Sequence, residues 1–202
     1  MIKKYENEIF HENKRFLNLI ETLKNNDINF NISKNNICTF DSEGLSDIAT
    51  YETFLNKFEE ISDNELKFTD IEIDDYDYDE CAEEEHENFD EFILKNILKD
   101  GKIDIQKFEF SMDNTPISIY LKINGDNISL DVEFMHDWFD YKLIYNLNDK
   151  LKELNYNKYF WFSNSWEECT VIYANQSDIN KINNEMKKNK KFKSNTPFIT
   201  KE

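Results

Sequence analysis

The sequence predicts an α+β protein, in which an antiparallel sheet is formed mainly by the C-terminal half and a mostly helical N-terminal half packs against it. Two observations lead to this class. Residues 117–123 and 128–134 alternate apolar and polar side chains, and the pair Asn124-Gly125 lies between them, which is a strong hairpin signal. In residues 3–25 and 46–61, apolar residues instead recur at the spacing of one helical face.

Local signals set the expected bounds of the elements in the N-terminal half. Ser46 can cap the second helix, and Gly101 can end the third in the conformation that glycine adopts most easily. The alternation of the third strand is imperfect around Asp70. We expect helices over residues 3–25, 46–61 and 81–99, and strands over 28–33, 37–40 and 66–73.

The C-terminal half is expected in the order β-β-β-α-β-β-α. Its first three strands would form a meander, with a β-bulge where the alternation slips at residues 106–107. Residues 159–162 are apolar on both faces, which is typical of a central strand covered twice, and Ser177 can cap the last helix. The expected strands are 103–112, 117–123, 128–134, 159–162 and 170–173, and the expected helices are 141–154 and 177–186.

The hairpin around Gly125 decides which side chains of its strands face the core. An Asn-Gly loop would pair Leu121 with Ile128, whereas a Gly-Asp loop would pair it with Leu130. Both registers turn the same face inward, because side chains alternate with a period of two. We therefore expect Ile119, Leu121, Leu130 and Val132 to be buried, and Lys122, Asp131 and Glu133 to face outward.

The chain is expected to form one compact unit of two lobes. Residues 1–101 would be the mostly helical lobe, which contains an acidic segment at 63–91. Residues 102–186 would be the sheet lobe with its two helices, and 187–202 a frayed Lys-rich tail. No internal repeat and no Gly/Ser linker divides the sequence.

Composition excludes several classes of protein. The 202 residues are 39% hydrophobic and 15% aromatic, which is too much core material for a disordered chain. The net charge of -18 makes direct nucleic-acid binding unfavourable, because a polyphosphate would be repelled. Only 3 glycines occur, which excludes a Gly-rich phosphate loop.

Targeting and cysteine patterns indicate a cytoplasmic protein. The N-terminus lacks an apolar signal region, and no window approaches the roughly 18 apolar residues of a membrane span. Cys38, Cys81 and Cys169 are far apart and form no CxxC pair, as expected of free thiols in a reducing compartment. We expect no membrane association, no metal and no cofactor.

The acidic segment 63–91 is the strongest functional signal. It holds 15 acidic residues against one base, Lys67, and therefore carries -14 of the net -18. Such a field can steer a basic partner and speed its association; alternatively, the segment is a solvated face that keeps the protein soluble. The residues that we assign to partner binding are Asp74, Asp75, Tyr76, Asp77, Tyr78, Asp79, Glu80, Glu83, Glu84 and Glu87.

A calcium-binding loop is a more specific alternative for the same segment. Asp75, Asp77 and Asp79 stand at alternate positions, like the first three ligands of an EF-hand. The sixth position of that motif requires glycine and the twelfth glutamate, whereas Glu80 and His86 stand there. The pattern therefore fails at two positions that set the geometry of the loop.

Carboxylates also gather around His136. Together with Asp131, Glu133 or Asp137, this imidazole can hold a divalent ion or act as a base. The structural alternative has the strand carboxylates facing water and Asp140 capping the next helix. Similarly, Cys169 is either a core residue or a thiol nucleophile, and the aromatic stretch 156–166 either core or an exposed interface anchor.

We interpret the protein as a non-enzymatic acidic binding protein that neutralises or occupies a basic partner, in the manner of an immunity protein or a phage inhibitor. The expected partner is a basic protein, for example a nucleic-acid-binding protein or a toxin. The interpretation depends on charge, size and composition and on no diagnostic motif. Two alternatives stay open: a metal-dependent enzyme that uses the carboxylates near His136, and an accessory domain of unknown role.

Overall fold

The computed structural model describes residues 9–41, 49–75, 115–134, 139–165 and 168–200. Within these ranges the strands form two antiparallel sheets, one of order β1-β2-β7-β6 and one of order β3-β4-β5. The first sheet consists of β1 (Phe10–His11), β2 (Ile37–Asp41), β7 (Glu168–Ala174) and β6 (Tyr159–Asn164). The second consists of β3 (Phe68–Asp75), β4 (Thr115–Ile123) and β5 (Asp126–Phe134).

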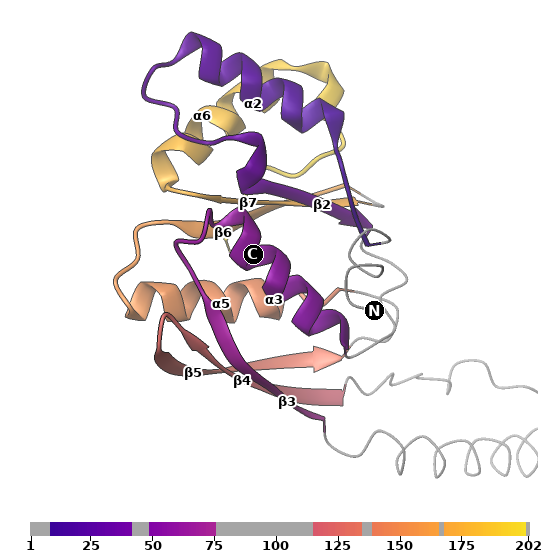
Figure 1. Ribbon diagram of the computed structural model, residues 1–202. Helices are drawn as coiled ribbons and strands as arrows, with labels where there is room; N and C mark the ends of the chain where they lie inside the picture. The colour runs from indigo at the N-terminus through magenta and orange to yellow at the C-terminus, as the bar shows by residue number, and fades with distance from the viewer. Residues whose placement is uncertain (1–8, 42–48, 76–114, 135–138, 166–167, 201–202) are drawn as a thin grey trace, which may run out of the picture.

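Helices and sheets alternate in four layers (Figure 1). Helices α2 (Lys14–Asn26) and α6 (Gln176–Lys188) cover one face of the first sheet. Helices α3 (Ala49–Ile61) and α5 (Lys142–Glu153) lie between the two sheets and pack on both. The predicted α+β class with antiparallel sheets is thereby confirmed. Each sheet takes strands from both sides of Gly101, since β2 pairs with β7 and β3 with β4.

The hairpin between β4 and β5 follows the Asn-Gly register. Asn124 and Gly125 have φ angles of 51° and 97°, as the two central residues of a type I′ turn require. Leu121 accordingly lies opposite Ile128. The expected faces are confirmed: Ile119, Leu121, Leu130 and Val132 are buried, whereas Asp131 is exposed and Lys122 and Glu133 are partly exposed.

The third strand of this sheet is β3, which comes from the N-terminal half. It occupies the free side of β4, where we expected residues 103–112, and those residues lie outside the described ranges together with the bulge expected at 106–107. The imperfect alternation in β3 is itself a β-bulge. The register shifts between Thr69 and Glu72, and Asp70 has a φ of 53° there.

β6 is an edge strand, contrary to the central position that its apolar sequence suggested. Its outer side pairs with the C-terminal segment, since Phe162 N–H donates to the Ile199 carbonyl at 2.9 Å and Ile199 N–H returns a bond at 3.0 Å. The expectation of a frayed tail is also wrong, because Phe192 and Phe198 are buried against α2 and α6. Two phenylalanines among the lysines hold the segment on the core.

Several helix ends differ from the expected ones because another side chain provides the cap. α2 begins after Asn13, whose side chain accepts bonds from the amides of Arg15 and Phe16. The helix expected at 3–25 is not continuous, because Phe10–His11 form β1, and residues 3–8 lie outside the described residues. α6 is capped by Asn175, two residues earlier than Ser177. Residues 28–33 form no strand, although Phe30 and Ile32 are buried. Ser46 and the helix expected at 81–99 lie outside the described residues.

Candidate functional site

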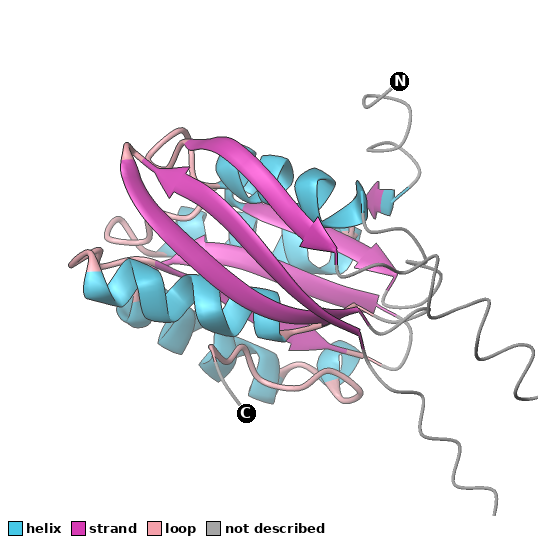
Figure 2. Cartoon of the chain, turned by 90° about the horizontal axis from the view of Figure 1, so that it is seen from below, coloured by secondary structure: helices cyan, strands magenta, loops and turns pink. Residues whose placement is uncertain are grey.

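The sheet β3-β4-β5 leaves one face uncovered. Its inner face packs on α3 and α5, while no described helix or strand lies over the other side, which faces the viewer in Figure 2. We call this side the outer face. It consists of Thr69, Asp70, Glu72, Asp74, Ser118, Tyr120, Lys122, Asn127, Ser129, Asp131 and Glu133.

The outer face is acidic, and its one lysine is paired. Its five carboxylates face one lysine, and that lysine, Lys122, forms an ion pair of 2.7 Å with Asp70. Glu133 pairs with Lys142 at the start of α5, and Asp131 accepts a 3.2 Å hydrogen bond from Ser118. Glu72 and Asp74 are exposed and have no partner among the described residues. The face therefore presents uncompensated negative charge.

Two of the binding residues predicted from the sequence, Asp74 and Asp75, lie within the described residues. Asp74 is exposed on β3, and Asp75 is the last residue of that strand. Their role in binding stays a prediction. The outer face as a unit was not expected, although strand alternation had placed Asp131 and Glu133 on it. The remaining predicted residues, Tyr76, Asp77, Tyr78, Asp79, Glu80, Glu83, Glu84 and Glu87, lie outside the described residues.

The carboxylates near His136 have structural partners where they are described. His136 and Asp137 lie outside the described residues. The buried Asp140 accepts hydrogen bonds from Glu133 N–H at 2.6 Å and Lys142 N–H at 2.8 Å, so it fastens the end of β5 to the start of α5. Burial raises the pKa of Asp140 despite these two bonds. Within the described ranges, no group of three His, Cys, Asp or Glu side chains is placed to hold a metal ion.

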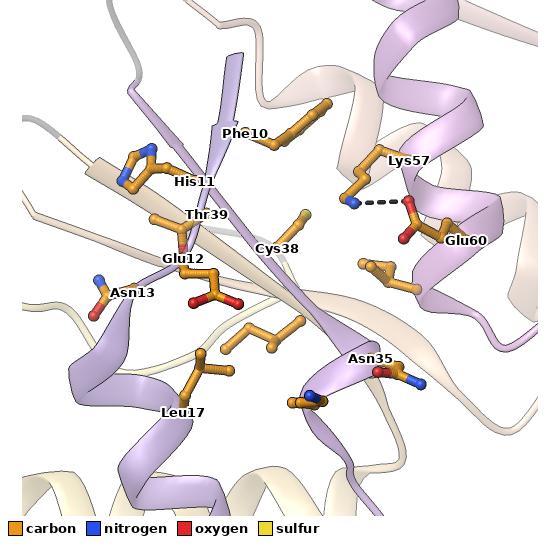
Figure 3. Close-up of a pocket in the computed structure, with 13 residues that line it drawn as sticks. Phe10, His11, Glu12, Asn13, Leu17, Asn35, Cys38, Thr39, Lys57 and Glu60 are labelled. Atoms are coloured by element: carbon orange, nitrogen blue, oxygen red, sulfur yellow. Dashed lines mark hydrogen bonds and ion pairs between the residues drawn. The ribbon is translucent and has the colours of Figure 1, made fainter. Parts of the chain in front are cut away.

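A groove of about 340 Å³ lies where β1, the start of α2, β2 and α3 meet (Figure 3). Two of its charged side chains pair with each other, since Lys57 Nζ lies 2.7 Å from Glu60 Oε2; the same Nζ lies 5.6 Å from the centre of the Phe10 ring. Cys38 lines its floor and is buried. His11 also lines the groove, and its Nε2 lies 3.3 Å from Glu168 Oε1 on β7, so its imidazole contacts a carboxylate that is not part of the groove lining.

The two described cysteines are core residues. Cys38 on β2 and Cys169 on β7 are both buried and free. Burial raises the pKa of the Cys38 thiol to about 12 and that of Cys169 well above its usual range. Trp161 is also in the core, where its indole N–H donates to the Ala174 carbonyl at 2.8 Å. The core interpretation of Cys169 is confirmed; Trp166 lies outside the described residues.

We expect Cys38 and Cys169 to resist alkylation in the folded protein. At pH 8 a thiol with a pKa of about 12 is ionised in only about one molecule in ten thousand, and the thiolate is the reactive form. In a Cys81→Ser background, mass spectrometry after iodoacetamide treatment should show no rapid adduct in buffer and two adducts in denaturant. Two rapid adducts in buffer would contradict the burial of these thiols.

Comparison of the chain with known protein families, with curated proteins and with solved structures finds no match. Among the described residues, no helix is of a length and apolarity that would let it cross a bilayer.

Proposed function

We propose that this protein is a non-enzymatic acidic binding protein that occupies a basic protein partner. The observation that carries the proposal is the outer face of sheet β3-β4-β5. Five carboxylates lie there on a rigid support, the single lysine is already paired with Asp70, and no described element covers them. Charge that merely solubilises a protein does not need to be gathered on one uncovered sheet face.

The acidic segment extends this charge along the chain. β3 lies within residues 63–91, and Asp74 and Asp75 stand at its end. The total of -18 gives a long-range attraction for a basic surface, whereas a second acidic protein or a nucleic acid is repelled. A partner that normally binds a polyanion, such as a nucleic-acid-binding protein or a toxin acting on nucleic acid, offers the complementary charge. Inhibition would follow from occupation of its basic surface.

A variant that removes four charges from this segment tests the proposal. Replacing Asp74, Asp75, Asp77 and Asp79 by Asn keeps their size, and we expect unchanged or slightly higher stability because like-charge repulsion falls. Association with a basic partner should slow, most strongly at low salt, where the Debye length is roughly 30 Å at 0.01 M against about 8 Å near physiological ionic strength. The measurement is the association rate constant at both salt concentrations.

The partner is obtained by affinity purification from the native cell, with washes at low and then high salt, and is then produced in pure form for the rate measurement. The control is a variant with four exposed acidic residues changed outside sheet β3-β4-β5 and outside residues 63–91: Glu12→Gln, Glu21→Gln, Asp41→Asn and Glu52→Gln. This control has the same net charge as the test variant. Equal rates for both variants and the wild type at both salt concentrations would remove the acidic segment from the function.

A further inference from the structure

We infer that the outer face of sheet β3-β4-β5 is the docking surface for the basic partner and that it seats an arginine side chain of that partner on the ring of Tyr120. This inference depends on the proposed function and adds the place and the chemistry of the contact. The other possible occupants, a lysine side chain or a second copy of this chain, are outcomes of the test given below.

Tyr120 stands at the centre of the outer face. It is on the middle strand, with Glu72 directly opposite on β3 and Ser129 directly opposite on β5. In the next row, Asp74 and Asp131 flank Ser118. The Tyr120 side chain is 45% exposed, and among the described residues only Ile28 is a more exposed large apolar side chain. An aromatic ring therefore lies open to solvent between carboxylates on both neighbouring strands.

The bulge at Asp70 is what creates this arrangement. With an unbroken register, Ile71 would lie opposite Tyr120, and Glu72 would point towards the core. The extra residue shifts the phase, so that Glu72 lies opposite Tyr120 and Ile73 opposite the buried Ile119. Asp70 adopts the left-handed φ of 53° that this shift requires, a conformation in which aspartate is tolerated better than most residues. The same change therefore turns the partly buried Ile73 towards the core and turns Glu72 and Asp74 outward.

Two carboxylates near Tyr120 have no cationic partner among the described residues, so the face can accept one added cation. Lys122 is held by Asp70 at 2.7 Å, so its ammonium group is drawn to the bulge, and Glu133 is paired with Lys142. Glu72 and Asp74 have no described partner, and they lie in the row of Tyr120 and in the adjacent row. Directly opposed side chains in a sheet are about 5 Å apart and diagonal ones about 7–8 Å apart. A planar cation on the ring of Tyr120 is thus within reach of both carboxylates.

A guanidinium group fits these features better than an ammonium group. Its flat, weakly hydrated plane stacks on an aromatic ring, while its fork of N–H donors bonds to carboxylates at the edge. A second copy of this chain would bring another -18 to the surface, which opposes self-association through this face. Charge complementarity therefore selects an arginine-bearing partner.

The test uses defined peptides, so that it does not require the natural partner. A peptide of alternating arginine and serine and a matched lysine–serine peptide are titrated at low salt into the isotopically labelled full-length protein, and amide chemical shifts and dissociation constants are measured. The variants are Tyr120→Ala, Tyr120→Phe and Glu72→Gln. Glu21→Gln on α2, in the layer farthest from the outer face, is the charge-matched control.

We expect the arginine peptide to bind more tightly than the lysine peptide and to shift the amides of β3, β4 and β5 around Tyr120. Tyr120→Ala should weaken binding about three- to fivefold, whereas Tyr120→Phe retains the ring and should change it little. Glu72→Gln should weaken binding about twofold, and more than Glu21→Gln does.

Three results would overturn the inference. The first is equal affinity of Tyr120→Ala and the wild type, the second is amide shifts confined to residues outside this sheet, and the third is equal binding of the two peptides. Binding that is confined to residues 76–91 would leave the proposed function standing without this docking face. If neither cationic peptide binds at low salt, both proposals fail. Dimerisation that sedimentation detects without any peptide, and that Tyr120→Ala abolishes, would overturn the inference and assign the face to a second copy.

Discussion

Replacing Phe54 by Ala is expected to lower the free energy of unfolding by about 3–5 kcal/mol, the usual range for truncation of a buried phenylalanine. Phe54 lies on α3, is 1% exposed, and joins the first sheet to the helix layer. Its ring centre is 4.6 Å from that of Phe40 on β2, 4.5 Å from Phe139 and 5.1 Å from Phe10. The substitution removes these three ring contacts and a fourth, of 6.1 Å, with Phe58 on the same helix, and it leaves a cavity between elements that are distant in sequence.

The measurement is chemical denaturation of Phe54→Ala and of the wild type. Ile28→Ala is the control, because Ile28 is 98% exposed and its loss should change stability by less than about 0.5 kcal/mol. Phe54→Leu, which keeps part of the volume, should fall between the two and stay measurable if the alanine variant does not fold. Similar stabilities of Phe54→Ala and Ile28→Ala would contradict the arrangement of the helix layer.

The second large effect is expected at Asn148, a buried amide on α5. Its Nδ2 donates to the Phe160 carbonyl at 2.8 Å, and its Oδ1 accepts from Phe160 N–H, also at 2.8 Å. The Asn148 side chain thereby forms the two backbone hydrogen bonds that a neighbouring strand would otherwise form with Phe160 of the edge strand β6. Asn148→Ala leaves both backbone groups of Phe160 buried without a partner, at about 1–3 kcal/mol each, so we expect a loss of about 2–6 kcal/mol.

Asn148→Asp separates the hydrogen bonds from the packing, because it has nearly the same shape. An ionised carboxylate facing the Phe160 carbonyl is unfavourable, so the pKa of the introduced acid should be raised in the folded state. Stability that depends on the protonated form is present at low pH and is lost as pH rises through that raised pKa. The stability deficit of Asn148→Asp relative to the wild type should therefore grow from pH 4 to pH 7.

Asn180→Ala, at an exposed asparagine of α6, serves as control and should change stability little at either pH. If the stability difference between Asn148→Asp and the wild type did not vary with pH, the result would argue against the paired hydrogen bonds of Asn148.

Local patterns in the sequence determined the hairpin and its faces. Asn124-Gly125 can adopt positive φ at both positions, and the alternation on either side fixes which residues are buried whichever register forms. The helical faces of α3 and α5 were likewise evident, because their apolar residues recur at helical spacing. These features involve residues close in sequence, where turn chemistry and periodicity act directly. The acidic character of residues 63–91 is also a property of the sequence alone.

Only the tertiary structure decided which strands are neighbours and what the charges face. β3 pairs with β4 across 39 undescribed residues, and Ile199 pairs with β6. Both pairings depend on long-range packing, which the periodicity of the sequence does not encode. The outer face likewise brings Glu72 and Asp131 to either side of Tyr120 from three strands, and it exists because the bulge at Asp70 reverses the phase of β3. A one-residue slip exchanges the two faces of a strand. The sequence therefore showed that β3 is acidic, but only the register in the fold decided that its outward carboxylates lie beside the exposed ring of Tyr120.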